Sequence, residues 1–116
     1  IAEDNEEESL EFINNCNASI LGAHLELQGF DMSKGMPCMD GMSRQPFEKF
    51  DMVLTGHFHA KSTQGNIHYL GAQMEFFWND CDDPKYFHIL DTKTRELTPI
   101  QNPYRIYEKI TITKNS

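Results

Sequence analysis

Apolar residues near the start of the chain change from a helical spacing to an extended run. In residues 5–15 they recur at helical intervals around Leu10, which predicts a short helix that ends at the Asn-rich residues 14–17. The next run, residues 18–23, is mostly apolar and ends at His24. Such a run predicts a buried strand with a histidine at its end.

A stretch rich in Met, Gly, Ser and Pro, residues 31–44, follows and predicts a long loop. The rest of the chain alternates short apolar or aromatic runs with Asn-, Asp- and Gly-containing turns. We expect strands at residues 52–54, 66–70, 76–78, 86–90 and 96–100. The order predicts an α/β beginning followed by mostly antiparallel β structure, in one domain without repeats or linkers.

The length and the cysteine content limit the kind of protein. The chain has 116 residues, of which 39% are hydrophobic, enough for one small core. It begins at Ile1 with neither a signal peptide nor a transmembrane run, so we expect it to be a piece with residues missing upstream. Its three cysteines have no CxxC spacing, which predicts reduced thiols in a cytosolic setting.

The chain is acidic, with a formal net charge of −8 and only ten Lys and Arg residues. This balance argues against a large autonomous nucleic-acid surface, because phosphate binding depends on clustered cations. Divalent metal ions change the inference, since they offset the acidic residues around them. The acidic run at residues 3–8 is interpreted as a solvated helix start.

The candidate chemistry lies in Thr55-Gly56-His57-Phe58-His59, directly after an apolar run. Alternation along an extended backbone would place His57 and His59 on the same side, and Gly56 would allow a sharp turn there. His24 also ends a predicted strand, and the carboxyl ends of α/β strands form binding sites. The sequence therefore predicts a metal site of His24, His57 and His59, with zinc, manganese or iron as suitable ions.

The remaining polar candidates are weaker. Three histidines could close a mononuclear zinc site with an open fourth position, and Glu26 is then a weak candidate for the general base. His68 and His88 lie within β patterns flanked by aromatic residues, so we exclude both as ligands. We interpret the Asp residues within 79–84 as part of a turn.

Aromatic residues near the motif have two interpretations each. Phe58 is expected to pack and to fix the histidine rotamers, with base stacking as the alternative. The run Phe76-Phe77-Trp78 is expected in the core or at an interface with the missing upstream residues.

Four stretches carry a family resemblance. The strings at residues 21–30 (LGAHLELQGF) and 54–59 (LTGHFH) resemble the second half of a calcineurin-like metallophosphoesterase domain. The strings at residues 67–71 (IHYLG) and 79–92 (NDCDDPKYFHILDT) resemble the nuclease subunits of DNA recombination and repair complexes, which include T-even-phage recombination endonuclease subunits and SbcD-type nucleases.

This resemblance implies a fold and a site. The fold is a four-layer αββα sandwich, of which residues 1–116 would be the C-terminal half. Two divalent metal ions, usually manganese in the nucleases, sit at the strand ends. By this resemblance His24 and His57 would bind one ion and His59 the other. The ions would activate water for in-line attack on a DNA phosphodiester.

The resemblance also predicts what the piece cannot do alone. The family's Asp-x-His, Gly-Asp-x-x-Asp and Gly-Asn-His-Asp/Glu motifs are absent from this sequence. We therefore expect weak metal binding and no catalysis by residues 1–116 in isolation.

The implied whole protein has defined partners and a location. It would act on DNA as a homodimer with a coiled-coil ATPase subunit, away from membranes, in the cytoplasm of a bacterial or phage-infected cell. Two other functions stay open at this point. One is a phosphatase or cyclic-nucleotide phosphodiesterase of the same superfamily, and the other is a non-catalytic scaffold.

Overall fold

The chain begins with the predicted helix. The computed structural model describes residues 1–114, and here a 3-10 turn (η1, Glu3–Asn5) leads into α1 (Glu6–Asn14). Three glutamates occupy the first turn of α1, where the helix dipole favours negative charge. Ile13 is the buried residue of the helix and attaches it to the core.

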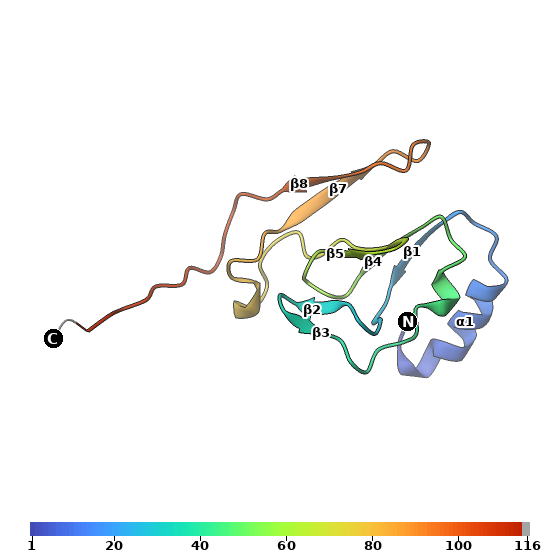
Figure 1. Ribbon diagram of the computed structural model, residues 1–116, viewed down its shortest axis with the longest axis horizontal. Coiled ribbons are helices and arrows are strands. Elements are labelled where there is room, and N and C mark those ends of the chain that lie inside the picture. The colour runs from blue at the N-terminus through green and yellow to red at the C-terminus, as the bar shows by residue number, and fades with distance from the viewer. Residues whose placement is uncertain (115–116) are drawn as a thin grey trace.

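The centre of the molecule is a four-stranded mixed sheet in the order β1-β4-β6-β5 (Figure 1). β1 (Ile20–His24), β4 (Met52–Gly56) and β6 (Ile67–Tyr69) run parallel, and β5 (Ser62–Gln64) is antiparallel to β6. The parallel pairs bring the carboxyl ends of β1 and β4 to one edge. The mixed α/β class predicted from the sequence is confirmed.

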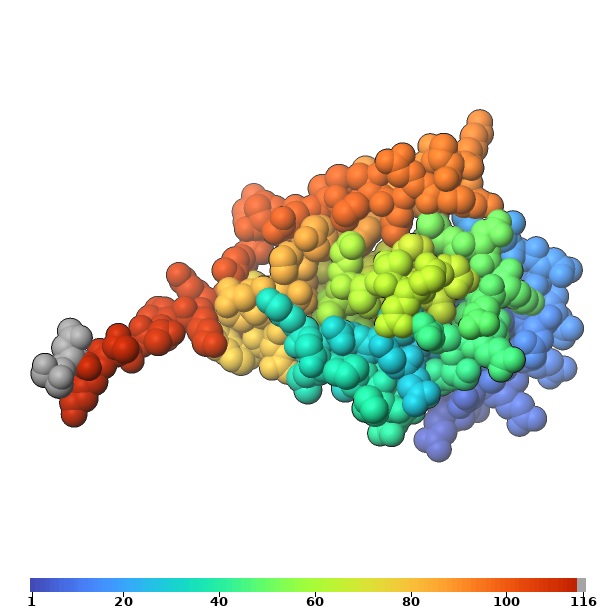
Figure 2. All heavy atoms as spheres, in the orientation of Figure 1, coloured from blue at the N-terminus to red at the C-terminus, as the bar shows by residue number. Residues whose placement is uncertain are grey.

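Two antiparallel hairpins lie outside this sheet. One joins β2 (Asp31–Ser33) to β3 (Met36–Pro37), and the other joins β7 (Tyr86–Leu90) to β8 (Leu97–Gln101). These hairpins agree with the predicted shift to antiparallel β structure in the later part of the chain. After β8, residues 102–114 run away from the sheet as an extended segment (Figures 1 and 2).

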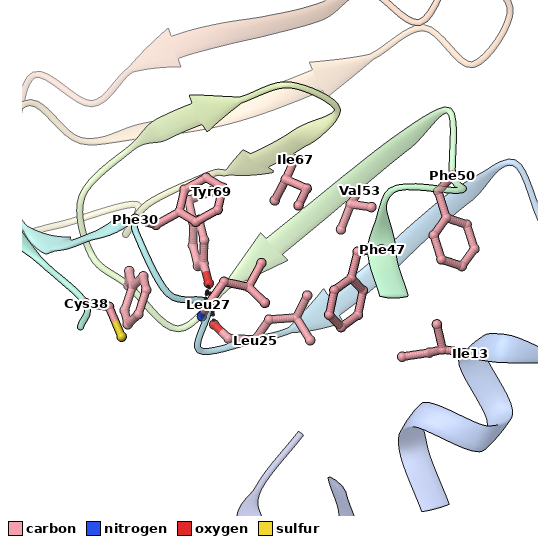
Figure 3. Packing of buried hydrophobic residues seen from close by; sticks show 11 residues of the cluster. Ile13, Leu25, Leu27, Phe30, Cys38, Phe47, Phe50, Val53, Ile67 and Tyr69 are labelled. Carbon is pink, nitrogen blue, oxygen red and sulfur yellow. Dashed lines mark hydrogen bonds between the residues drawn. The ribbon is translucent and has the colours of Figure 1, made fainter. Parts of the chain in front are cut away.

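The core packs the inner face of the sheet against the segment that follows β1 (Figure 3). Tyr69 from β6 is buried, and its hydroxyl donates to the Leu25 carbonyl at 2.7 Å and accepts from the Leu27 N–H at 3.0 Å. The Thr55 hydroxyl accepts from the Leu25 N–H at 3.1 Å. These bonds satisfy backbone groups that would otherwise be buried without partners, and they fix the chain just after His24.

One predicted strand is wrong. Residues 76–78 do not pair with another strand, and Trp78–Asp80 forms a 3-10 turn, η3. The reason is local, because the Asp80 carboxylate accepts from the Phe76 and Phe77 N–H groups and closes a turn. Phe76, Phe77 and Trp78 are all more than half exposed, so this run is not in the core, and its alternative interpretation as an interface with upstream residues stays a prediction.

Two smaller expectations need correction, and two short elements lacked a sequence signal. The loop predicted at residues 31–44 contains the β2–β3 hairpin. Its Met- and Gly-rich composition gives no alternating pattern from which two strands could be predicted. The strand that ends at His24 is only half-buried, because β1 is an edge strand of the sheet. The polar strand β5 and the 3-10 turn η2 (Gln45–Phe47) carry no apolar pattern of their own and were not predicted.

The cysteines and the helices bear on the expected cellular environment of the protein. Cys16, Cys38 and Cys81 are free thiols, as predicted. Within residues 1–114, no helix has the length and apolar character needed to cross a membrane.

Candidate metal centre

Parallel pairing of β1 and β4 brings His24 and His57 together. His24 is the last residue of β1 and lies opposite Gly56, the last residue of β4, so that His57 follows at the same edge. The His24 Nε2 and His57 Nδ1 atoms lie 3.1 Å apart. The two rings meet edge to face, with centroids 5.0 Å apart.

The backbone at this edge is strained to permit the contact. His57 has a φ of 96°, a conformation that side chains with a Cβ rarely adopt. The sharp turn expected at Gly56 is therefore made by His57 itself, and Gly56 serves another purpose. A Cβ at residue 56 would lie 3.3 Å from the His24 Nδ1, so the glycine leaves room for the imidazole. Strain of this kind is typical of functional sites.

The two nitrogens are at hydrogen-bonding distance, so one imidazole can donate to the other. Two imidazole nitrogens each about 2.1 Å from one octahedral ion, at roughly a right angle, would also be about 3 Å apart. The pair is therefore close enough together to bind one divalent ion in place of the hydrogen bond. Both side chains are exposed enough to receive a ligand, and the Glu26 carboxylate lies 3.9 Å from the His57 Nε2. Glu26, the weak candidate for a base, is thus near the site but makes no hydrogen bond to it at this distance.

His59 lies beside the pair and does not join it. Together with His57 it lines an open hollow of about 330 Å³, which His24 does not line. Met32, Ser33 and Met36 of the β2–β3 hairpin also line this hollow. Within the described residues, no three His, Cys, Asp or Glu side chains converge closely enough to hold an ion. The predicted set of three is therefore arranged as a pair, His24 and His57, with His59 separate.

The direct partner of His59 is a carboxylate. The Asp80 Oδ2 lies 3.1 Å from the His59 Nδ1, and Asp80 is only 2% exposed. Burial alone would raise the pKa of this carboxyl group. Hydrogen bonds from the Phe76 and Phe77 N–H groups, from His59 and from Lys85 outweigh it and lower the pKa to about 2.

The sequence does not predict the roles of Asp80 and Lys85. It places Asp80 in a turn, and that interpretation is correct as far as it goes. Lys85 is buried, with its ammonium 3.2 Å from the Asp80 Oδ1 and 2.8 Å from the Asp83 Oδ2. A lysine in a turn-rich stretch gives no signal of burial, because lysines are rarely buried unless they are paired.

Two aromatic side chains near His57 and His59 have different environments, one buried and one exposed. Phe58 is buried and stacks on Tyr69 with centroids 4.8 Å apart, so the packing interpretation of Phe58 is confirmed. Phe77 is exposed and stacks on the His59 ring with an interplanar angle of 5°. Phe77 also lines the hollow beside His59.

Comparison with known proteins finds relatives along most of the chain. No family model matches it. Exonuclease subunit 1 of Enterobacteria phage T4 is 34% identical over 102 residues, which cover 88% of this chain and 30% of the relative. The SbcD subunit of the SbcCD nuclease of Staphylococcus saprophyticus subsp. saprophyticus is 26% identical over 95 residues, which cover 76% of this chain and 25% of the relative.

The chain thus spans less than a third of the length of either relative. Both relatives carry the names of nuclease subunits. The resemblance suggested by the motifs is confirmed, because this chain is similar to nuclease subunits that include exonuclease subunit 1 and SbcD.

Proposed function

We propose that this chain supplies part of the metal centre of a metallophosphoesterase-type DNA nuclease. The observation that carries the proposal is the 3.1 Å approach of the His24 and His57 nitrogens at the carboxyl ends of two parallel strands. His24 and His57 would hold one divalent ion, and His59 would hold a second one at the adjoining hollow. Manganese is the ion we propose for both.

Bound divalent ions would activate water and neutralise charge that develops on a phosphodiester. The chain's own residues have separate tasks in this proposal. His57, with its strained backbone, and His24, at the end of the edge strand, would supply two nitrogens to one ion. The open hollow beside His57 and His59 leaves access for a phosphate group. Phe58 and Tyr69 pack beneath the histidine edge and hold it in place.

The described residues do not amount to a complete catalytic site. Catalytic zinc sites keep three protein ligands for one ion, and this chain brings two histidines together. We therefore propose that residues 1–116 form the C-terminal part of a larger phosphoesterase domain. Residues upstream would supply the other ligands, and this chain alone would not catalyse hydrolysis.

The names of the relatives support nucleic acid over small phosphate esters as the substrate. Both are named nuclease subunits, so DNA cleavage is favoured over the action of a phosphatase or cyclic-nucleotide phosphodiesterase. The word subunit in both names also supports work within a complex. We propose a homodimer with a coiled-coil ATPase subunit in recombination and repair, in the cytoplasm of a bacterial or phage-infected cell.

The test is DNA cleavage by the longer protein in which these residues follow their proposed upstream half. With manganese, we expect it to cleave linear DNA and not a phosphomonoester or a cyclic nucleotide. His57→Ala should abolish cleavage, whereas His68→Ala, at a histidine outside the site, should retain it. Cleavage that survives His57→Ala would contradict the assignment. Cleavage of only the small esters would favour the phosphatase alternative, and no hydrolysis at all would favour the scaffold.

A further inference from the structure

Asp80 lies at the centre of a buried network beside His59. Its Oδ2 accepts from the Phe76 N–H at 2.8 Å and from the Phe77 N–H at 3.0 Å, and it faces the His59 Nδ1 at 3.1 Å. Its Oδ1 faces the Lys85 ammonium at 3.2 Å. Apart from the histidine, every group around this carboxylate is a donor with no capacity to accept.

The donors decide the protonation of the histidine. A carboxylate that faces two amides and an ammonium is an acceptor toward all of its neighbours. The His59 nitrogen that faces it must therefore carry a hydrogen. A neutral imidazole has one N–H and one lone pair, so the lone pair of His59 belongs to Nε2.

We propose that Asp80 is a positioning residue that fixes His59 in its Nδ1–H tautomer and leaves Nε2 as the nitrogen that binds a divalent cation. The cation part of this inference rests on the function proposed above. The tautomer part rests on the contacts of Asp80 alone.

Lys85 and Phe77 restrain the same ring from other directions. Lys85 donates to the His59 carbonyl at 2.9 Å while it pairs with Asp80, so one ammonium ties the His59 backbone to the carboxylate that holds its ring. Phe77 lies flat against the imidazole, with centroids 5.4 Å apart, and hinders its rotation. The His57 ring is held differently, because its Nδ1 lies 3.1 Å from the His24 Nε2 and the exposed Glu26 carboxylate is 3.9 Å from its Nε2.

A purely structural role is the alternative for this network. Buried Asp–Lys pairs can simply hold a turn together, and loss of one partner destabilises the fold by leaving a buried charge unpaired. Stability measurements cannot separate the two roles. Metal binding at the His59 Nε2 can, because removal of the carboxylate of a purely structural pair would leave the affinity of a folded protein for the ion unchanged.

The experiment is nitrogen-15 NMR of the histidine side chains of the metal-free protein at a pH where the rings are neutral. We expect the hydrogen of His59 on Nδ1 in the wild-type protein. Lys85→Met keeps the carboxylate and should keep that tautomer. Asp80→Ala combined with Lys85→Met removes the carboxylate without leaving a buried lysine unpaired, and it should give a mixture of tautomers.

The outcomes separate the two proposals. An Nε2–H tautomer of His59 in the wild-type protein would overturn the inference, whether or not the variants fold. Retention of a single Nδ1–H tautomer in the folded double variant would also overturn it. Zinc, a diamagnetic probe, should shift the Nε2 resonance and leave Nδ1 protonated, and the double variant should bind zinc about 10- to 100-fold more weakly than Lys85→Met. An Nδ1–H tautomer with no zinc shift at Nε2 would support the role of Asp80 and contradict the metal function of His59.

Discussion

The His24 Nε2 and the His57 Nδ1 lie 3.1 Å apart although 33 positions separate the two residues in the chain. Parallel pairing of β1 with β4 produces this contact, because it places both strand ends at one edge of the sheet. The contact is made at the expense of regular backbone, since His57 has a φ of 96°. The contact between the two nitrogens therefore depends both on the backbone conformation of His57 and on the pairing of β1 with β4.

Relief of the strain at residue 57 should stabilise the fold. His57→Gly allows the positive φ at little cost, whereas His57→Ala keeps a Cβ in the strained conformation. We expect the glycine variant to be more stable than the alanine variant by about 1 kcal/mol. Urea unfolding of the two variants measures this difference. Equal stability would mean that the backbone at residue 57 is not strained in solution.

A methyl group at residue 56 should disturb the ligand pair more than the fold. The added Cβ would lie 3.3 Å from the His24 Nδ1, so the imidazole must shift to accommodate Gly56→Ala. We expect weaker manganese binding by calorimetry with a small loss of stability. Gly22→Ala is the matched control, because a Cβ at Gly22 in the paired strand has no neighbour within 4 Å. Equal binding by both variants would show that the position of the His24 ring is not critical.

Removal of the Tyr69 hydroxyl should loosen the segment after His24. This hydroxyl bonds both the Leu25 carbonyl and the Leu27 N–H in the core, so Tyr69→Phe leaves two buried backbone groups unsatisfied. We expect a loss of about 1–3 kcal/mol in the free energy of unfolding. Tyr104→Phe, at a side chain that is 82% exposed, should cost little in the same chemical denaturation experiment. A similar small effect at both positions would contradict the role assigned to the Tyr69 hydroxyl.

The strand ends could be predicted from the sequence, but the neighbourhood of His59 could not. Apolar runs that end in His24 and in Thr55-Gly56-His57 indicated the correct edge of the sheet, because buried parallel strands are short and apolar. The aromatic run 76–78 has the composition of a strand. The Asp80 carboxylate, however, accepts hydrogen bonds from the Phe76 and Phe77 N–H groups and closes a turn. When a side chain accepts hydrogen bonds from backbone N–H groups that a strand would otherwise use, the sequence shows no periodic pattern that reveals it.

The acid stability of the fold should depend on Asp80. Its pKa is lowered to about 2 from the usual 3.8, so the ionised group stabilises the folded state above about pH 4, and this contribution disappears as the pH falls toward 2. The shift corresponds to roughly 2 kcal/mol. Urea unfolding between pH 6 and pH 2.5 should show a flatter pH dependence for Asp80→Asn than for the wild-type protein. Asp40→Asn provides the control, since its side chain is exposed and the variant should retain the wild-type dependence.

The central claim is that the histidine edge of this chain binds divalent metal. Calorimetric titration of manganese into the chain tests it most directly, with two variants in parallel. One replaces His24, His57 and His59 by alanine, and the other replaces His68 and His88 by alanine. We expect weak binding by the wild-type chain and by the His68 and His88 variant, and none by the triple variant. Equal binding by all three proteins, or no binding by the wild-type chain, would contradict the account.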